Sequence, residues 1–528
     1  MAMASPASEE QYRHEQEAFV SNHGGTTPQE IICTLLPNVC GVLLTATILA
    51  VSRNYTHRNV RVLIEFVLTV IPTVLCCTVL SEHVGVVCIV MISISVVNIL
   101  LLASRGINLP GSPMRPVTGK RPFITNFRAL TNIITAICVL AVDFQIFPRK
   151  FAKTETFGYS LMDTGVGLFI FANALVAPEA RDLSVHRQGG FRETIRRNMK
   201  NCIRSCLPLL LLGFGRFAIV EYTAYQKHVT EYGIHWNFFI TLAAVKLFTG
   251  MITSTINSEY SLLSGIWILG MHEYIINTTG LKEWVLSNEP RNDFFSANRE
   301  GLISIPGYVG LYFIGVAVGR LIHSTYRNSH REYMLHHTHK DISMKLFDLQ
   351  LDASYNESMT LCIKLSLISA QACIATLFCD MYFNVSRRLA NVGYCAWILT
   401  LTTVLLTLLL LVEIVLDIIN YAVSESRAES RTERLRKNLR LNLKKHVESK
   451  GEEDKECLVR RTLEIFDAVN YNGLFFFLFS SLLTGLVNMS VYTLYTKQTI
   501  ALLILVIYMA VNVFSILIFY RLQISFKL

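Results

Sequence analysis

The chain contains few charged residues for its length. Asp, Glu, Lys and Arg make up 16% of its 528 residues, whereas soluble proteins average about 25%. Hydrophobic residues make up 52%, and the mean hydropathy is +0.41. The alternating stretches of roughly ten residues that build an outer-membrane barrel are missing, and the apolar runs are instead long enough to cross a bilayer as helices. The composition therefore excludes a soluble enzyme and predicts an α-helical membrane protein.

The sequence also lacks the signals of several particular chemistries. Its 13 cysteines are odd in number and show neither zinc nor disulfide spacing, so we expect them to be small core residues. The first 30 residues are polar, so we expect no cleavable signal peptide and a first span that directs its own insertion. There is no nucleophile elbow, P-loop, dinucleotide fingerprint or zincin motif. We expect no metal, no permanently bound cofactor and no nucleic-acid partner.

Long apolar windows predict thirteen membrane-spanning helices and hence an all-α, polytopic fold. The eighth window is the weakest, because His272 and Glu273 interrupt it. The predicted spans cover residues 31–51, 62–80, 84–104, 125–147, 159–180, 202–220, 238–256, 260–277, 302–322, 357–380, 391–421, 467–487 and 498–520.

The distribution of Lys and Arg predicts the orientation of these spans. Cytosolic loops of membrane proteins carry an excess of both residues. The pattern therefore predicts a lumenal N-terminus and a cytosolic C-terminus, and it leaves the sequons at Asn277 and Asn384 on the lumenal side, where glycosylation acceptors must lie. The basic loops are 52–61, 105–124, 181–204, 320–346, 422–465 and the C-terminal tail.

The predicted spans divide the chain into four parts. Residues 1–30 form a lumenal segment, and residues 31–421 hold the first eleven spans together with a lumenal-side catalytic site. Residues 422–465 form a basic cytosolic loop, in which leucines at four-residue spacing predict an amphipathic helix on the cytosolic leaflet. We expect that helix to bind anionic lipid or a partner helix. Residues 466–528 hold the last two spans and a short cytosolic tail.

A carboxylate and three cations lie together at the lumenal end of the fourth predicted span. Asp143 is followed by Arg149, Lys150 and Lys153. Ionisable groups at this depth are costly and usually functional. Three lumenal cations also oppose the charge bias of the other loops, so an anionic ligand explains them better than topology does. The alternative is that they are anchors that pair with lipid phosphates.

Asp143 and Lys153 are the main catalytic candidates. Burial raises the pKa of a carboxyl group and a nearby ammonium lowers it. Such a pair could hold a base that takes a proton from a hydroxyl. Pro148 ends the helix, so the chain can turn and bring Lys153 back toward Asp143. The alternative is a buried ion pair with a structural role.

Other polar side chains of the lumenal segments are candidates for substrate binding. An aspartate beside small residues in the fifth span either contacts a ligand or pairs helices. A His-Trp-Asn run before the seventh span either binds a sugar or anchors the chain at the interface. These candidates are Asp163, His235, Trp236, Asn237, Asn298, Arg299 and Glu300.

Residues 143–167 closely resemble a motif of the GPI inositol acyltransferases. This family comprises the phosphatidylinositol-glycan class W proteins of animals and the GPI-anchored wall transfer proteins of fungi. The resemblance extends over nearly the whole chain, and the thirteen spans and the lumenal N-terminus agree with it. Further similar segments are residues 19–22, 230–237, 298–301, 386–391 and 472–488.

The resemblance implies a multi-pass enzyme of the endoplasmic reticulum membrane. It would transfer a fatty acyl group, usually palmitoyl, from acyl-CoA as co-substrate to the inositol 2-hydroxyl of glucosaminyl-phosphatidylinositol. The catalytic Asp and Lys of the family correspond to Asp143 and Lys153. We expect direct transfer, with Asp143 as general base and Lys153 as its orienting or electrostatic partner. Arg149 and Lys150 would hold a phosphate of the lipid or of CoA.

A secondary transporter of a lipid-linked or anionic solute is the alternative function. Arg216, Lys246 and Lys364 lie at membrane depth, where a transporter would use them. Internal pairing or snorkelling explains these residues more simply. The remaining ionisable groups gather at one membrane face rather than at the midplane, which favours the enzyme.

Overall fold

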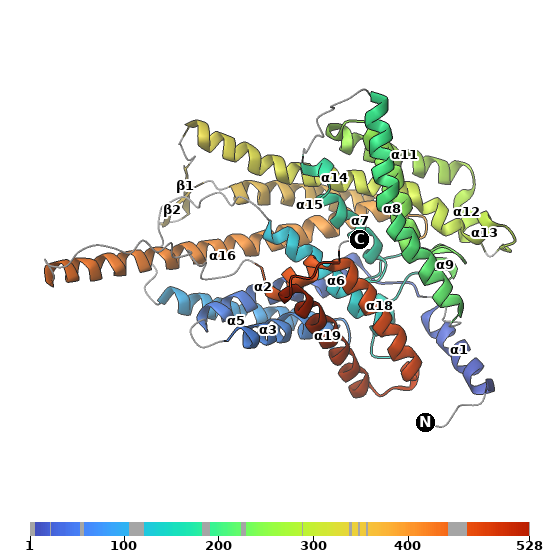
Figure 1. The fold of residues 1–528 in the computed structure, drawn as a ribbon, viewed down its shortest axis with the longest axis horizontal. Coiled ribbons are helices and arrows are strands. Elements are labelled where there is room, and N and C mark those ends of the chain that lie inside the picture. The colour runs from blue at the N-terminus through green and yellow to red at the C-terminus, as the bar shows by residue number, and fades with distance from the viewer. Residues whose placement is uncertain are drawn as a thin grey trace.

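The computed structural model shows long helices that run side by side in one elongated bundle (Figure 1). It describes residues 6–21, 23–52, 57–104, 121–181, 191–222, 229–287, 289–336, 341–346, 349–354, 357–441 and 462–526. Within these residues, ten helices are long and apolar enough to cross a membrane. The prediction of an all-α, polytopic membrane protein is therefore confirmed.

These ten helices coincide with ten of the thirteen predicted spans. The second one is composite, because a π-helical turn (Phe66–Val70) joins α3 (Arg58–Glu65) to α4 (Ile71–Cys76). The others are α2 (Pro28–Val51), α5 (Val84–Ser104), α6 (Pro122–Ala141), α10 (Phe238–Thr255), α14 (Arg299–His336), α15 (Glu357–Tyr382), α16 (Val392–Leu441), α18 (Gly473–Ser490) and α19 (Gln498–Arg521).

The remaining three predicted spans correspond to α7 (Thr164–Leu175), α8 (Phe191–Tyr222) and α11 (Ser261–Thr278). At 12 residues, α7 is too short to cross a bilayer by itself. The number of crossings therefore stays a prediction. Short helices complete the fold: α1 (Pro6–Val20), α9 (Val229–Tyr232), α12 (Leu281–Leu286), α13 (Phe294–Ala297) and α17 (Glu464–Tyr471).

The polar pair that weakens the eighth span is buried and satisfied. On α11, a ring nitrogen of His272 lies 2.9 Å from the carbonyl oxygen of Leu389. The Glu273 carboxylate accepts a hydrogen bond of 3.0 Å from the backbone N–H of Val392, the first residue of α16. A carboxylate is favoured at a helix N-terminus, where it meets unpaired N–H groups and the positive end of the dipole. The interruption in hydropathy thus marks a contact between helices.

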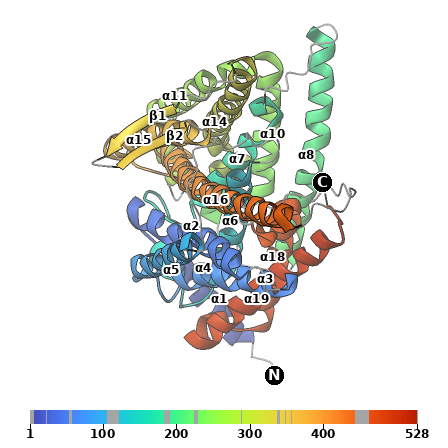
Figure 2. The same ribbon diagram turned by 90° about the vertical axis from the view of Figure 1, so that its left-hand side faces the viewer.

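Three groups of helices pack around a common centre. The N-terminal helices α2–α5 lie on one side of the bundle, and α11, α14 and α15 lie on the other (Figure 2). Between them run α6, α7 and α16, whose inward side chains form one continuous hydrophobic core. The 12 cysteines of the described chain are free thiols, and most of them are buried in the helices.

The loops of alternate spans gather at opposite ends of the bundle. At one end, the N–H of Gly158 bonds the carbonyl of Val385 at 2.9 Å, and the N–H of Ile234 bonds the carbonyl of Ala297 at 2.9 Å. At the other end, Glu464 accepts hydrogen bonds from Arg58 and Arg521, and Asn472 bonds the carbonyl of Ile524. The first set belongs to the loops predicted to be lumenal and the second to those predicted to be cytosolic. This separation agrees with an odd number of crossings.

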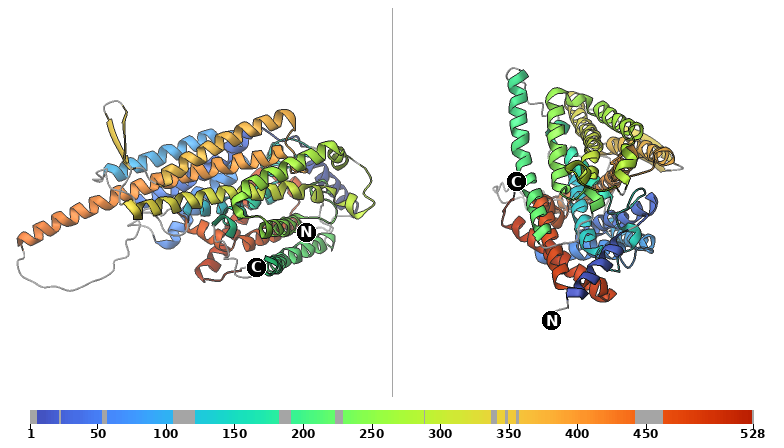
Figure 3. Two further views of the ribbon diagram at one scale, coloured as in Figure 1. Left: turned by 90° about the horizontal axis from the view of Figure 1, so that it is seen from above. Right: turned by 90° about the vertical axis from the view of Figure 1, so that its right-hand side faces the viewer.

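The amphipathic helix predicted within residues 422–465 is not a separate element. Residues 422–441 continue α16, which projects beyond the neighbouring helices along the bundle axis (Figures 1 and 3). After Gly393 this helix contains no glycine or proline that would end it. The rest of the predicted segment, 442–461, lies outside the described residues. An antiparallel hairpin, β1 (Asp341–Leu346) and β2 (Leu349–Ser354), joins α14 to α15, with Asp341 opposite Ser354.

Two contacts at opposite ends of α18 make the orientation testable. Tyr12 of α1 bonds Thr493, just after this helix, whereas Ile524 near the C-terminus bonds Asn472, just before it. In sealed microsomes we expect added protease to remove an epitope tag from the C-terminus and to leave an N-terminal tag intact. Detergent should expose both tags. Equal protection or equal digestion of the two tags in sealed vesicles would contradict an odd number of crossings.

Candidate functional site

A cavity of about 650 Å³ lies at the end of the bundle that is predicted to be lumenal. Its walls come from α6, α7, α10 and α18 together with the segments before α7 and α10. Asp143 and Lys153 both line it, so the tertiary structure brings the two predicted catalytic residues to one space. The other ionisable or hydroxyl-bearing residues of its lining are Ser21, Thr131, Thr135, Glu155, Thr164, Arg216, Thr230, Glu231 and Tyr232.

Asp143 lies two residues beyond the end of α6 and is 8% exposed. Its Oδ2 accepts a hydrogen bond of 2.7 Å from Nδ2 of Asn488, a residue of α18. Burial raises the pKa of this carboxyl group to about 6, although the hydrogen bond from Asn488 and the charges of Arg149 and Lys153 oppose the rise. Asp143 is therefore a stronger base than an ordinary aspartate and is still mainly ionised at pH 7.

The segment after Asp143 folds back because Arg149 holds it from within. The guanidinium of Arg149 donates hydrogen bonds to the carbonyl oxygens of Val142, Phe144 and Phe147 at 2.9–3.0 Å. Its carbon also lies 4.0 Å from the ring centre of Phe19, at the end of α1. These contacts occupy the side chain with the protein's own backbone. Arg149 thus stabilises the turn that brings Lys153 to the cavity.

Lys150 is also engaged within the protein, through an ion pair with Glu30 at the start of α2. Among the described residues that line the cavity, neither Arg149 nor Lys150 occurs. The expectation that these two cations hold an anionic group of a substrate therefore finds no support in this structure. Of the three cations predicted to be functional, the one at the cavity is Lys153.

The ammonium of Lys153 is held by an ion pair with Glu231, which follows Thr230 in α9. The other carboxylate oxygen of Glu231 lies 3.5 Å from the Arg387 guanidinium. Arg387 in turn donates a 2.8 Å hydrogen bond to Asp163. The four side chains form a row of alternating charge, which we call the ion-pair row (Lys153, Glu231, Arg387 and Asp163). It joins three segments that are far apart in the sequence.

Asp163 serves this row and does not reach the cavity. Its Oδ2 accepts hydrogen bonds from the backbone N–H and the hydroxyl of Thr154, at 3.1 Å and 2.7 Å. The side chains of Asp163 and Arg387 are only 5% and 4% exposed. Thr154 directly follows Lys153, so Asp163 fixes the backbone beside that lysine. Of the two alternatives predicted for Asp163, a ligand contact or an internal contact, the structure shows an internal contact.

The three residues of the His-Trp-Asn run differ in their position relative to the cavity. Trp236 and Asn237 line the cavity, whereas the exposed ring of His235 packs near Phe217 and Phe294 instead. Asn237 caps α10, because its Oδ1 accepts hydrogen bonds from two backbone N–H groups of the first turn. The Trp236 indole donates to the hydroxyl of Thr241 at 3.0 Å. Trp236 offers the cavity an aromatic face, while Oδ1 of Asn237 caps α10 and its Nδ2 donates to the carbonyl of Gly213 in α8.

Asn298, Arg299 and Glu300 are fully buried and lie outside the cavity lining. Asn298 accepts a hydrogen bond of 2.9 Å from the backbone N–H of His235. Glu300 forms ion pairs with Arg388 at 3.0 Å and with Arg291 at 2.6 Å. These contacts fix the segment before α10 against the start of α14. Asn298 therefore supports the cavity wall from behind, and the expectation that these three residues bind substrate finds no support in this structure.

Sequence reasoning missed Glu231, Arg387 and Asn488. A signal for Arg387 was present, because it is a lumenal cation that opposes the charge bias in the same way as Lys153. Asn488 is a polar residue near the lumenal end of an apolar span, which also marks a candidate. Their partners could not be read from the sequence, since Asn488 and Asp143 are separated by most of the chain.

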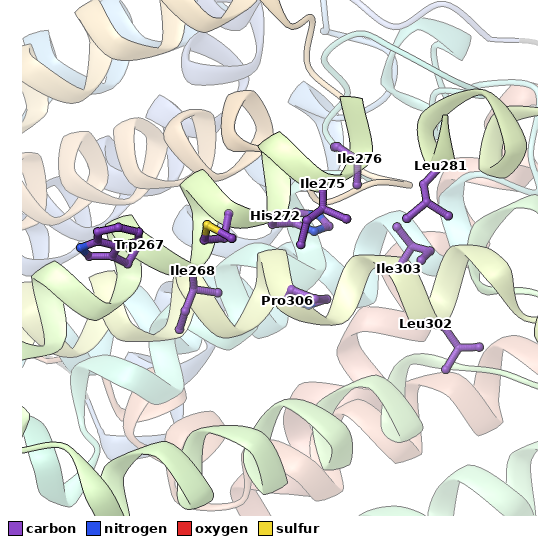
Figure 4. A pocket seen from close by; sticks show the side chains of 10 residues that line it. Trp267, Ile268, His272, Ile275, Ile276, Leu281, Leu302, Ile303 and Pro306 are labelled. Carbon is purple, nitrogen blue, oxygen red and sulfur yellow. The ribbon is translucent and has the colours of Figure 1, made fainter. Parts of the chain in front are cut away.

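A second hollow of about 390 Å³ lies between α11 and α14 (Figure 4). Its ten described lining residues include no carboxylate and no lysine or arginine. Figure 4 shows aliphatic side chains around most of it, with Trp267 at one end. His272 reaches it but is bonded to the backbone of Leu389. This hollow is an apolar surface feature, so the chemistry belongs to the first cavity.

The ion-pair row predicts a large stability effect at Arg387. An Arg387→Ala variant would leave Asp163 and Glu231 buried without their cation, which costs about 3–5 kcal/mol. We expect a clear fall in the midpoint of thermal unfolding of the detergent-solubilised protein. As a control, Arg58→Ala removes an arginine whose side chain is 65% exposed, and it should cost less than about 1 kcal/mol. Equal losses in the two variants would contradict a structural role for the buried row.

Comparisons with known proteins agree with the resemblance found in the sequence. A family model described as GWT1 matches residues 12–519. The glucosaminyl-phosphatidylinositol-acyltransferase PIGW of Bos taurus is 32% identical over 527 residues, covering 94% of this chain and 95% of that protein. The protein of the same name from Homo sapiens is 32% identical over 526 residues, covering 96% and 97%. The GPI-anchored wall transfer protein 1 of Candida albicans is 29% identical over 510 residues, covering 93% and 94%.

The match extends over almost the whole chain and over nearly the full length of each relative. It includes every segment that lines the cavity and every member of the ion-pair row. The chain belongs to the GWT1 family.

Proposed function

We propose that this chain is an acyltransferase that moves a fatty acyl group from acyl-CoA to the inositol 2-hydroxyl of glucosaminyl-phosphatidylinositol. Two of its relatives bear the name of an acyltransferase of this lipid. The observation that carries the proposal is the placement of a buried carboxylate, with its pKa raised, and a lysine in one cavity of a membrane protein. Acyl transfer to a hydroxyl needs a base of this kind.

Asp143 is the general base in this proposal. It takes the proton of the inositol 2-hydroxyl while that oxygen bonds to the carbonyl carbon of the thioester. The carbon–sulfur bond then breaks, and the CoA thiolate leaves with the proton from Asp143. The hydrogen bond from Asn488 fixes one carboxylate oxygen, so the other can point to the substrate. No covalent enzyme intermediate is needed.

Lys153 is the electrostatic partner. Negative charge develops on the thioester oxygen in the transition state, and a cation already in place stabilises it without reorganisation. Glu231 and the rest of the ion-pair row hold the ammonium of Lys153 at the cavity. Lys153 also lowers the pKa of Asp143, which keeps the base ionised. The two residues therefore act on different atoms of the same step.

The cavity has the mixed lining that these substrates require. Of its charged groups, Asp143, Lys153 and Glu155 come from the segments beyond helix ends, Glu231 comes from the short helix α9, and Arg216 comes from α8. An inositol and a sugar would be bound among them. Trp236 adds an aromatic face of the kind that stacks on sugars. Deeper in the bundle, the lining from α6 and α7 has no charged side chain and includes Ile134, Val139, Val166, Leu168 and Phe169, so it suits a fatty acyl chain.

A secondary transporter remains the alternative function, but the cations at membrane depth give it little support. The ammonium of Lys246 donates to the carbonyl of Ser205 at 3.3 Å, and that of Lys364 donates to the hydroxyl of Thr325 at 3.1 Å. Both contacts join neighbouring helices. Arg216 does line the cavity, in the same space as Asp143 and Lys153. These positions favour the enzyme.

The proposed reaction also sets the location and partners. The partners are the lipid bilayer, glucosaminyl-phosphatidylinositol and acyl-CoA, with palmitoyl-CoA as the donor that the family implies. We place the protein in the endoplasmic reticulum membrane, where GPI precursors are made. Catalysis through Asp143 and Lys153 requires no metal and no permanently bound cofactor.

Asp143→Asn tests the general base. The variant keeps the shape of the side chain and its contact with Asn488 but cannot take a proton. With labelled palmitoyl-CoA and glucosaminyl-phosphatidylinositol, we expect kcat for acylated lipid to fall by about 10²–10⁴-fold. Asp293→Asn alters an exposed acid at the same end of the bundle, away from the cavity, and should leave kcat unchanged. Full activity of Asp143→Asn would remove this residue from the mechanism. Uptake of the lipid into sealed vesicles without acylated product would favour the transporter.

The pH dependence of kcat/KM provides a second test. The base works in its ionised form, and its pKa is about 6, so activity should be full above pH 7 and should fall as the pH drops through 6. Because the hydrogen bond from Asn488 lowers the pKa of Asp143, Asn488→Leu should move the midpoint to higher pH. A profile that is flat between pH 5 and pH 8 would contradict this assignment.

A further inference from the structure

The inner part of the cavity follows one uncharged face of α6, on which the hydroxyls of Thr131 and Thr135 donate to backbone carbonyls of the same helix. The lining residues Thr131, Thr135, Cys138 and Val142 recur at intervals of three or four, which places them on the same side of the helix. At 1.5 Å per residue they extend over about 16 Å along the axis. We call the part of the cavity along this row the apolar arm. Asp143 lies directly after the row, so the apolar arm and the end of the cavity that holds Asp143 form one continuous space.

Three phenylalanine rings from three helices close the inner part of this arm. We call Phe169 of α7, Phe238 of α10 and Phe477 of α18 the aromatic wall. Their ring centroids lie 5.5–5.6 Å apart in every pair, and all three residues line the cavity. The buried ring of Phe239 packs behind Phe477 at 5.8 Å. Core side chains therefore support the aromatic wall, and its rings cannot move aside without disturbing that packing.

The distance of the aromatic wall from Asp143 along the bundle can be derived from α18. Asn488 of this helix bonds Asp143, and Phe477 precedes Asn488 by about 16 Å along the helix axis. Near its start, α18 passes beside α6, because a Cβ on Gly473 would lie 3.6 Å from the amide of Asn132. Phe477 is one turn beyond Gly473. The wall thus lies level with the inner end of the lining row on α6, and far from the catalytic carboxylate.

We propose that the aromatic wall sets the length of the acyl chain that the enzyme accepts. This inference rests on the proposed function, since it takes the apolar arm as the site of the donor's chain. With the thioester at Asp143, the methyl end of the chain meets the rings of Phe477 and Phe169. A longer chain must displace rings that are packed in the core, and a shorter chain leaves an empty space. Both lower the stability of the transition state.

The test is a donor profile measured with acyl-CoA chains of increasing length and glucosaminyl-phosphatidylinositol as acceptor. Phe477→Leu should deepen the arm and shift the optimum of kcat/KM to longer chains. Phe477→Trp should fill it and shift the optimum to shorter chains. One methylene in an apolar pocket changes discrimination by about tenfold or more. We therefore expect the ratio of kcat/KM for a long and a short donor to change by at least about tenfold, in opposite directions.

Phe475 provides a matched control on the same helix. Its ring packs against Phe479, Phe519 and Phe526 and does not line the cavity. Phe475→Leu should therefore leave the donor profile unchanged. If Phe477→Leu is poorly folded, Phe169→Leu tests the same wall from α7 and should give the same direction of shift.

The possible failures are distinguishable. If the wild-type protein acylates the lipid and all wall variants share its donor profile, the aromatic wall does not select chain length and the inference is wrong. If the wild-type protein uses no acyl-CoA of any length, the proposed function itself is wrong. If Phe477→Leu and Phe477→Trp shifted the preferred donor length in the same direction, this would also contradict the inference that the size of the residue 477 side chain sets that length.

Discussion

The site depends on the buried ion pair between Arg387 and Asp163. Moving two charged groups out of water costs several kcal/mol for each ion, and their attraction offsets this cost only when geometry and hydrogen bonding are good. Here Asp163 is further bonded to Thr154, and Arg387 also reaches Glu231. The pair therefore ties the segment before α7 to the segment before α16, and through Glu231 it fixes Lys153.

This arrangement shows how a helical membrane protein can build a precise site from loops. Loops are usually mobile, and catalysis requires groups held in a fixed geometry. The segment around Asp143 is made rigid by Arg149, which donates to the carbonyl groups of Val142, Phe144 and Phe147. The segment before α10 is held by Asn298, and Arg388 bonds both Glu300 and the carbonyl of Glu155. Most of the charged residues named in this region thus pair with other parts of the protein.

The cavity separates two kinds of chemistry along its length. Charged residues gather where α6 ends, and the lining becomes apolar toward the aromatic wall. This gradient fits a reaction that joins a polar lipid headgroup to a hydrocarbon chain. It also explains the raised pKa of Asp143, because this carboxylate stands at the boundary and is removed from water by the core beside it.

The sequence by itself determined the membrane class, most of the helices and the family, because hydropathy and a contiguous motif are local properties. It also indicated Asp143 and Lys153, the two residues on which the proposed mechanism depends. It did not determine what the other charged residues do. Arg149, Lys150, Asp163 and the run 298–300 have the types expected of ligands, and the fold uses them as internal partners. Only the tertiary structure decided this, since ion pairs such as Lys153–Glu231 join segments whose proximity arises from the packing of whole helices. For the same reason it alone showed that α7 is short, that α16 continues past the bundle, and that Asn488 holds Asp143.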